Sequence, residues 1–221
     1  MSASKSFLQH FLAVNLVLVV LLVLVGCQKK EGEAAKPETA QIVAAAPITV
    51  ESLKAAYAAE SKRVDWYERF SKQAQKENLG DIAVLFKALA RSEKVHVDGA
   101  AALLKSKGIE VPTPTIEPVP AGKARQYLKL ALSNENVEQG IYASDTAKAR
   151  LEQFTEAAEW FKKALNSDAR HARLLKKAIE LETNFARLPY MMCPECGYIV
   201  GSDKLEECPV CKASKDKFQK I

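Results

Sequence analysis

The chain has 221 residues, which is enough for one or two domains, and its formal net charge of +5 is modest. The basic residues are spread along stretches of helical periodicity and form no cluster interleaved with aromatic residues. This distribution argues against a nucleic-acid partner.

The first 27 residues predict an export signal that is not part of the fold. Lys5 precedes an apolar run over 11–25, and the segment ends in Leu24-Val25-Gly26-Cys27. A basic start, an apolar core and a small residue before the cleavage position are the features of a signal peptide. The last four residues resemble the lipobox of bacterial lipoproteins, in which the cysteine becomes the lipid-modified first residue. Cys27 is therefore the expected lipidation site.

An uncleaved membrane anchor is the alternative, because residues 11–25 fall only slightly short of a membrane-spanning helix. Both interpretations tether the protein to a membrane, and a lipoprotein would lie on the periplasmic or cell-surface side. Without cleavage, Lys29 and Lys30 favour a cytoplasmic location for the rest of the chain. Residues 28–48 are rich in Ala, Glu, Lys and Pro without periodicity, which predicts a flexible tether.

Residues 49–186 predict a mainly α domain, a bundle of four long helices. Apolar residues recur at helical spacing from about residue 50 to residue 77, and again from residue 82 to about residue 106. The intervening Asn78-Leu79-Gly80 breaks the pattern, and Gly80 suits a helix C-cap. A connection this short predicts an antiparallel helix hairpin.

The segment 109–121 predicts a long crossover between the second and third helices. It contains four prolines, which keep the chain extended. Thirteen extended residues reach roughly 43 Å at ~3.3 Å each, about the length of a 27-residue helix. The third helix can therefore start at the opposite end, as in ferritin-like bundles. Ser144-Asp145 is the better local turn signal, but a turn near Gln153 is expected next, because it places Glu138 and Asp168 at the same level.

Acidic residues and histidines interrupt the apolar faces of all four helices. Glu93 and His96 lie one helical turn apart, and Asp168 and His171 repeat this arrangement. One such pair alone would be a core histidine satisfied by a neighbouring acid. Two pairs with further acids are costly to bury without a partner, and a metal pair would supply it, as in di-metal four-helix bundles. The full set is Glu60, Glu93, His96, Glu135, Glu138, Asp168 and His171.

This set, with Ala59-Glu60-Ser61 and Tyr67, resembles the ligands of the rubrerythrins over nearly all of residues 50–221. The resemblance implies a ferritin-like fold with two iron ions bridged by oxo and carboxylate groups. It also implies that Tyr67 lies near the irons.

The resemblance further implies a role for each ligand. Glu93 and Asp168 would bridge both irons, and His96 and His171 would each complete one iron. Glu138 would exchange with His96 when the oxidation state changes, and it is the candidate general acid. Two positions depart from the family. Asp168 replaces a glutamate, and Ala143, next to Tyr142, occupies the place of a second tyrosine.

Residues 187–221 predict a separate small metal module with a short β-strand. Two Cys-x-x-Cys pairs can place four thiolates around one ion, whereas disulfide pairing is the alternative. Zinc and iron share such a site. The Cys-Pro-x-Cys-Gly-Tyr opening and the tail 213–218 resemble the rubredoxin-like module of rubrerythrins, which favours a single iron. The four residues are Cys193, Cys196, Cys208 and Cys211.

Together these features predict an oxidoreductase, a non-haem di-iron peroxidase that reduces hydrogen peroxide to water. Electrons would come from an external donor through the four-cysteine iron. The resemblance implies a head-to-tail homodimer, in which one subunit's module serves the other subunit's di-iron site. The alternative is a membrane-tethered, ferritin-like protein that oxidises and binds iron, with structural zinc at the four cysteines.

Overall fold

The computed structural model describes residues 47–181, 189–201 and 205–221. The expected export signal, Cys27 and nearly all of the expected tether lie outside these residues. Among the helices of the described ranges, none is both long and apolar enough to cross a membrane.

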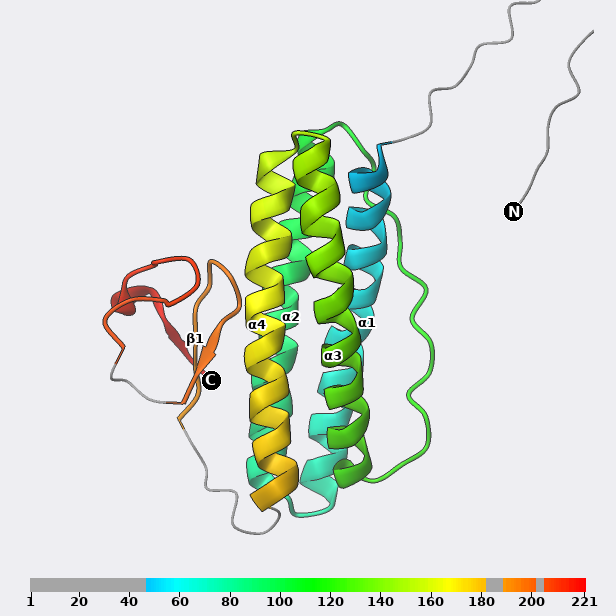
Figure 1. The fold of residues 1–221 in the computed structure, drawn as a ribbon. Coiled ribbons are helices and arrows are strands. Elements are labelled where there is room, and N and C mark those ends of the chain that lie inside the picture. The colour runs from blue at the N-terminus through cyan, green and yellow to red at the C-terminus, as the bar shows by residue number, and fades with distance from the viewer. Residues whose placement is uncertain (1–46, 182–188, 202–204) are drawn as a thin grey trace, which may run out of the picture. The chain divides into compact units, whose positions relative to one another are not determined.

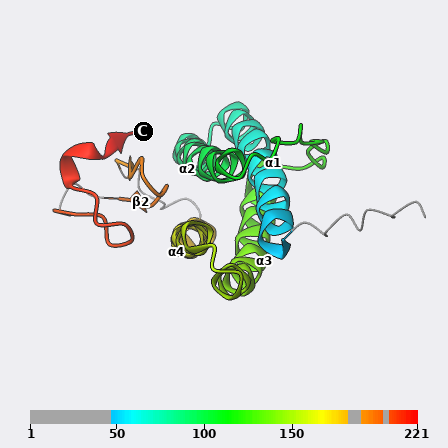
Figure 2. The ribbon, with the colours of Figure 1, turned by 90° about the horizontal axis from the view of Figure 1, so that it is seen from above.

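Four long helices form the main domain, as the sequence predicts (Figure 1). At ~1.5 Å per residue each helix is roughly 40 Å long. Figure 2 looks down the bundle and shows the α1–α2 hairpin beside the α3–α4 hairpin. The helices are α1 (Ile48–Lys76), α2 (Gly80–Ser106), α3 (Ala124–Leu151) and α4 (Thr155–Leu181).

Both hairpin turns are closed by a residue in the left-handed region. Asn78 has φ 57° between α1 and α2, and the turn predicted near Gln153 is confirmed, also with φ 57°. Asparagine is one of the few non-glycine residues that visits this region routinely. The prediction of Gly80 as the helix C-cap is wrong, because Glu77 is the C-cap of α1, Asn78 after it takes the left-handed conformation, and Gly80 begins α2.

Residues 107–123 form the predicted crossover, which Figure 1 shows running beside α1 from one end of the bundle to the other. Gly108 starts it with φ 69°, as a helix end requires. Two side chains attach the segment to the bundle. Trp66 Nε1 donates to the Glu117 carbonyl at 2.9 Å, and the Tyr127 hydroxyl donates to the Pro120 carbonyl at 3.0 Å.

The bundle core consists of two apolar clusters. One contains Phe70, Phe86 and Tyr127, and the rings of Phe70 and Tyr127 stack with centroids 4.1 Å apart. The other contains Leu53 and Phe161. Apart from Asp145, the buried acids and histidines of each helix lie between the residues of one cluster and those of the other. The four helices therefore carry one polar layer at mid-height, enclosed by apolar packing on both sides.

The C-terminal module is built on a small antiparallel sheet with strand order β2-β1-β3. A short 3₁₀ helix, η2 (Lys215–Lys217), precedes the last strand. The predicted apolar strand after the first cysteine pair is confirmed as β2. The strands are β1 (Met191–Met192), β2 (Ile199–Val200) and β3 (Gln219–Lys220).

Candidate metal centres

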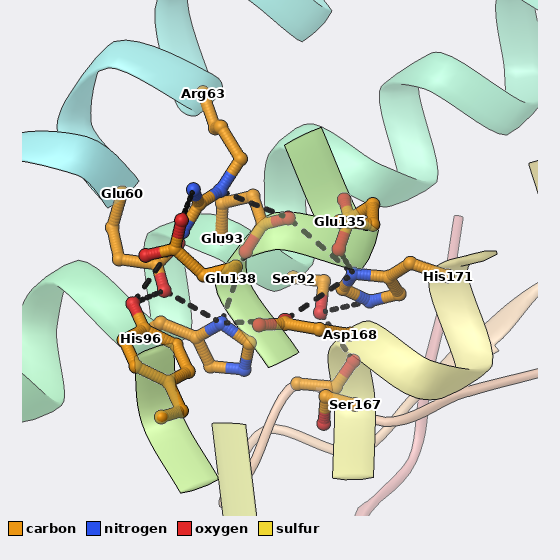
Figure 3. Close-up of polar contacts among 12 residues, drawn as sticks. Glu60, Arg63, Ser92, Glu93, His96, Glu135, Glu138, Ser167, Asp168 and His171 are labelled. Carbon is orange, nitrogen blue, oxygen red and sulfur yellow. Dashed lines mark hydrogen bonds and ion pairs between the residues drawn. The ribbon is translucent and has the colours of Figure 1, made fainter. Parts of the chain in front are cut away.

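The structure brings all seven predicted carboxylate and histidine residues into the polar layer of the bundle. Figure 3 shows their side chains turned toward one another from all four helices. Each is at least nine-tenths buried. The donor atoms of all but Glu138 form two groups, within each of which all atoms lie within 4.8 Å of one another. One group is Glu60, Glu93 and His96, and the other is Glu93, Glu135, Asp168 and His171.

Two carboxylates lie where both groups meet. Glu93 belongs to each group, with Oε2 at 2.9 Å from His96 Nδ1 and Oε1 at 3.3 Å from His171 Nδ1. Asp168 Oδ1 lies 3.8 Å from the first of these nitrogens and 3.7 Å from the second. This placement fits the bridging roles that the resemblance implies for Glu93 and Asp168.

Several buried carboxylate and imidazole atoms of the layer lack hydrogen-bond partners. They include both carboxylate oxygens of Asp168 and the Nδ1 nitrogen of His171. Buried polar atoms in proteins nearly always have a hydrogen-bond partner. Several unpaired atoms at one point therefore indicate that they bind a further group, such as a metal ion. Hard carboxylate oxygens with imidazole nitrogens are suitable ligands for iron. The others are Glu93 Oε1 and Glu135 Oε2.

Hydrogen bonds at the far side of each ring fix the orientation of the two histidines. His96 Nε2 donates to the Cys196 carbonyl at 3.2 Å, and His171 Nε2 donates to Ser92 Oγ at 2.9 Å. The Ser92 hydroxyl in turn donates to the Gly197 carbonyl. Holding a proton on Nε2 leaves Nδ1 free as the ligand atom, which is how outer partners commonly orient metal-binding histidines.

Without a metal, protons compensate part of the negative charge of the cluster. Burial, reinforced by Glu93, raises the pKa of Glu135 to about 7. Burial alone would lower the pKa of His171, but the Glu135 and Glu93 carboxylates raise it to about 10. Burial and the nearby Glu135 also raise the pKa of Asp168 well above its usual range. A divalent ion would therefore displace protons as it binds.

Arg63 is a buried cation in the same layer, which the sequence patterns did not predict. Its Nη1 donates to Glu138 Oε2 at 2.8 Å, and its Nη2 lies 2.6 Å from Glu60 Oε2. Surrounding carboxylates, first that of Glu60, raise the pKa of Arg63 well above its usual range despite the opposing effect of burial. The guanidinium is thus a permanent positive charge beside the candidate ligands.

Two tyrosines donate to carboxylates of the cluster. The Tyr67 hydroxyl, predicted to lie near the metals, bonds Glu135 Oε1 at 2.7 Å. The Tyr142 hydroxyl bonds Glu60 Oε1. Burial first, and then these carboxylates, raise the pKa of each tyrosine well above its usual range. Both hydroxyls therefore keep their protons at neutral pH.

The four cysteines of the module converge on one point. Cys193 Sγ lies 3.4 Å from Cys211 Sγ, and Cys196 Sγ lies 3.5 Å from Cys208 Sγ. These separations are far beyond the ~2.05 Å of a disulfide. They approach the roughly 3.8 Å between ligands of a tetrahedral ion with bonds of ~2.3 Å. The geometry fits a four-thiolate metal site rather than disulfide pairing.

The first cysteine turn of the module contacts the polar layer directly. The Cys196 carbonyl accepts from Ser167 Oγ at 2.7 Å as well as from His96. Gly197 has φ 77°, and a Cβ there would meet Ser92 Oγ at 2.6 Å and His96 Nε2 at 2.9 Å. Only a glycine permits this approach, so the contact depends on one residue.

The sequence carried a usable signal for part of what was missed. A serine immediately precedes the acid of each acid-x-x-His pair, in Ser92-Glu93 and Ser167-Asp168. Both serines hydrogen-bond the module. Arg63 follows Glu60 by three positions and precedes Tyr67 by four, which places it on the same buried face of α1.

Comparisons with known proteins agree with both centres. The family model "Rubrerythrin" matches residues 51–121, and the model "Rubrerythrin, rubredoxin-like domain" matches residues 192–219. The chain is 28% identical to "Rubrerythrin-2" of Clostridium acetobutylicum over 178 residues, covering 78% of this chain and 96% of that protein. It is 30% identical to "Nigerythrin" of Nitratidesulfovibrio vulgaris over 171 residues, covering 77% of this chain and 85% of that protein.

Solved structures of nigerythrin have the same fold. A structure described as a mixed-valence state superposes with a TM-score of 0.73 at 30% identity, covering 82% of this chain and 90% of that one. A structure described as fully reduced and all ferrous gives a TM-score of 0.73 at 28% identity, with 83% and 91% covered.

Proposed function

Because the chain belongs to the rubrerythrin family, with a carboxylate–histidine di-iron site and a four-cysteine rubredoxin-like site, we propose that it reduces hydrogen peroxide to water. When bound, the paired irons supply two-electron reduction of peroxide, and the four-cysteine iron supplies single electrons from an external donor. The residues of this chain bind the ions, orient them and exclude water.

Six of the seven predicted residues are proposed as direct ligands. Glu93 and Asp168 would be shared by the two ions, because each lies near both imidazoles. Glu60 and His96 complete one ion, and Glu135 and His171 complete the other, as the two groups of donor atoms suggest. Cys193, Cys196, Cys208 and Cys211 hold the single iron.

The observation that carries the proposal is the contact between Cys196 and His96. The backbone carbonyl of a proposed thiolate ligand accepts the Nε2 proton of a proposed ligand of the paired irons. One hydrogen bond therefore joins the two sets of ligands. A structural zinc clip would gain nothing from this contact, whereas a centre that supplies electrons needs a short connection to the site it serves.

Proton delivery is proposed to involve the hydroxyls and the carboxylate beside the cluster. The Tyr67 hydroxyl, which the sequence predicted near the metals, donates a hydrogen bond to Glu135 Oε1 at 2.7 Å and is the best-placed predicted hydroxyl for proton delivery. The candidate general acid, Glu138, has one oxygen engaged by Arg63. Because that oxygen accepts a hydrogen bond from Arg63 Nη1, proton transfer through Glu138 would use its other oxygen, Oε1.

Anaerobic purification of the protein tests this function. We expect two irons in the bundle and one iron at the four cysteines, and rapid reoxidation of the fully reduced protein by peroxide, followed in the visible spectrum. Zinc at the four-cysteine site, or slow reoxidation by peroxide, would reject the proposal and favour the iron-binding alternative.

A head-to-tail homodimer is proposed as the working form, with each module serving a partner's bundle. Such an exchange would use the Cys196–His96 contact described within one chain. Mixing a Cys208→Ser variant with a His171→Ala variant tests it, since each lacks one centre. Recovery of peroxidase activity in the mixture supports the exchanged dimer, and no recovery after subunit exchange has been verified argues against it.

Membrane tethering through a lipid on Cys27 is likewise proposed, on the sequence Leu24-Val25-Gly26-Cys27 alone. We expect mass spectrometry of the mature protein to find a lipid-modified N-terminal cysteine, and Cys27→Ala to abolish that modification. An unprocessed N-terminus would instead support the uncleaved anchor and a cytoplasmic domain.

A further inference from the structure

Arg63 is enclosed by candidate ligands rather than by solvent. The side chain is 3% exposed, and its guanidinium lies within 4 Å of three carboxylates of the polar layer. The contacts to Glu60 and Glu138 measure 2.6 and 2.8 Å, and the contact to Glu93 measures 3.8 Å. A guanidinium presents its donors in a rigid planar fork, so it fixes the direction of the groups it contacts.

The charge balance of the layer requires one cation besides the metals. Five carboxylates, when ionised, carry one more negative charge than two divalent ions neutralise. Arg63 is the residue of the described bundle that supplies this charge from within the layer. An uncompensated buried charge is strongly unfavourable, so the arginine and the metals together satisfy the carboxylates. The five are Glu60, Glu93, Glu135, Glu138 and Asp168.

The fork also determines which carboxylates can reach the metals. Glu138 belongs to neither of the two groups of converging donor atoms, although it lies one helical turn from Glu135, which does. Its Oε2 is held by Arg63 Nη1 instead. Glu60, by contrast, remains in its group, because its Oε1 lies 3.5 Å from His96 Nδ1.

We propose that Arg63 is a built-in counter-cation of the di-metal centre that holds Glu138 outside the coordination sphere. This inference rests on the proposed di-iron site, and it changes the expected behaviour of that site. The exchange of Glu138 for His96, which the resemblance implies, must here break a buried ion pair at 2.8 Å. Arg63 is therefore a positioning residue that keeps His96 as the ligand in both oxidation states.

A double-mutant cycle between Arg63 and Glu138 tests the positioning role. With Arg63 present, Glu138→Gln should leave two Fe(II) per chain and change their affinity by less than about threefold, because Glu138 is not a ligand. In the Arg63→Gln background, Glu138 is released toward the metals, and the same substitution should then lower the affinity by about tenfold or more. Anaerobic Fe(II) titration measures both values.

Loss of a metal ion in the single variant Glu138→Gln overturns the proposal, whether or not Arg63→Gln folds. An equal effect of Glu138→Gln in both backgrounds also overturns it. Neither readout uses peroxide. A slow peroxide reaction with an intact cycle would therefore reject the proposed function and leave the role of Arg63 standing.

The reduction potential of the di-iron centre gives a second readout that a purely structural role would not move. A fixed positive charge disfavours Fe(III), so Arg63→Gln should lower the midpoint potential, and Arg63→Lys should restore it by returning the charge. Arg69→Gln is the matched control, since Arg69 lies on the same helix but is exposed and pairs with Asp65 at 2.7 Å. An unchanged potential in Arg63→Gln, or an equal shift in Arg69→Gln, contradicts the proposal.

Discussion

Gly197→Ala is expected to separate the module from the bundle without unfolding either. The added Cβ would lie 2.6 Å from Ser92 Oγ and 3.0 Å from the Ser92 carbonyl oxygen, which belongs to rigid helical backbone. The cysteine turn itself should tolerate the change. The equivalent position of the second cysteine pair is Lys212, which already adopts φ 64° with a full side chain.

The magnitude follows from the contacts that the clash would break. Three hydrogen bonds reach the carbonyls of this turn, from Ser92, Ser167 and His96. At about 1 kcal/mol each, they contribute about 3 kcal/mol to docking, which corresponds to a change of roughly a hundredfold in the docking equilibrium. Electron transfer out of the module needs the docked state, so its rate should fall by at least about tenfold.

Stopped-flow absorbance tests this expectation. Fully reduced protein is mixed with peroxide, and the oxidation of the four-cysteine iron is followed by its visible bands. Lys212→Ala is the matched control, because it alters the same type of turn at an exposed position. A wild-type rate in Gly197→Ala would refute the reasoning, and equal slowing in Lys212→Ala would assign the effect to the turn instead of to docking.

Four further predictions concern the bundle. In equilibrium titrations, the affinity of the metal-free protein for Co(II) should rise at least about a hundredfold from pH 6 to pH 8. Ion binding must remove the proton of His171, whose pKa is about 10, and the proton of Glu135, whose pKa is about 7, adds to the slope. In the metal-free protein the His171 proton stabilises the fold, because the pKa of His171 is about 10 when folded and about 6.5 when unfolded. This stability is fully present below pH 6.5 and is lost as the pH rises through 10, so a urea midpoint that does not change from pH 6 to pH 10 would contradict the prediction. Asp168→Glu should retain two metal ions per chain by elemental analysis, since one added methylene keeps the carboxylate in reach of both imidazoles, and loss of an ion would show that Asp168 does not bridge. Arg63→Gln should lower the unfolding free energy of the metal-free protein by about 3–5 kcal/mol in urea denaturation, because the substitution leaves the carboxylates of Glu60 and Glu138 buried and unpaired. A change below about 1 kcal/mol would mean that these carboxylates take up protons instead.

The sequence identified the proposed ligands because each one violates a strong local pattern. An acid on an apolar helical face is visible without knowledge of the partner helix. The helical spacing of apolar residues also predicts Tyr57 and Val64 on the buried face of α1, where the structure has them only half-buried. Successive buried residues on one face of a helix are separated by either three or four positions. After Glu60 the separation is three, so the next buried residue is Arg63 and not Val64.

The docking of the module could not be read from periodicity. It joins Ser92 to Gly197, residues 105 positions apart, through a hydroxyl and a backbone carbonyl. A backbone carbonyl is present at every residue and therefore leaves no trace in the sequence. The close approach of α2 requires a glycine at position 197. A glycine after a cysteine pair is equally explained by the positive φ of the cysteine turn, so its presence in the sequence does not reveal the contact with α2.

The two groups of donor atoms differ in how they depend on the fold. Glu60, Glu93 and His96 all come from the α1–α2 hairpin, so one ion can be bound by that hairpin alone. The other group joins Glu93 to three residues of the α3–α4 hairpin. The second ion is thus a cross-link between the halves of the chain, and because its ligands converge only in the folded bundle, its binding free energy adds to the stability of the folded state. Metal loading should therefore have an order, with a local ion first and an ion that fastens the two hairpins together second.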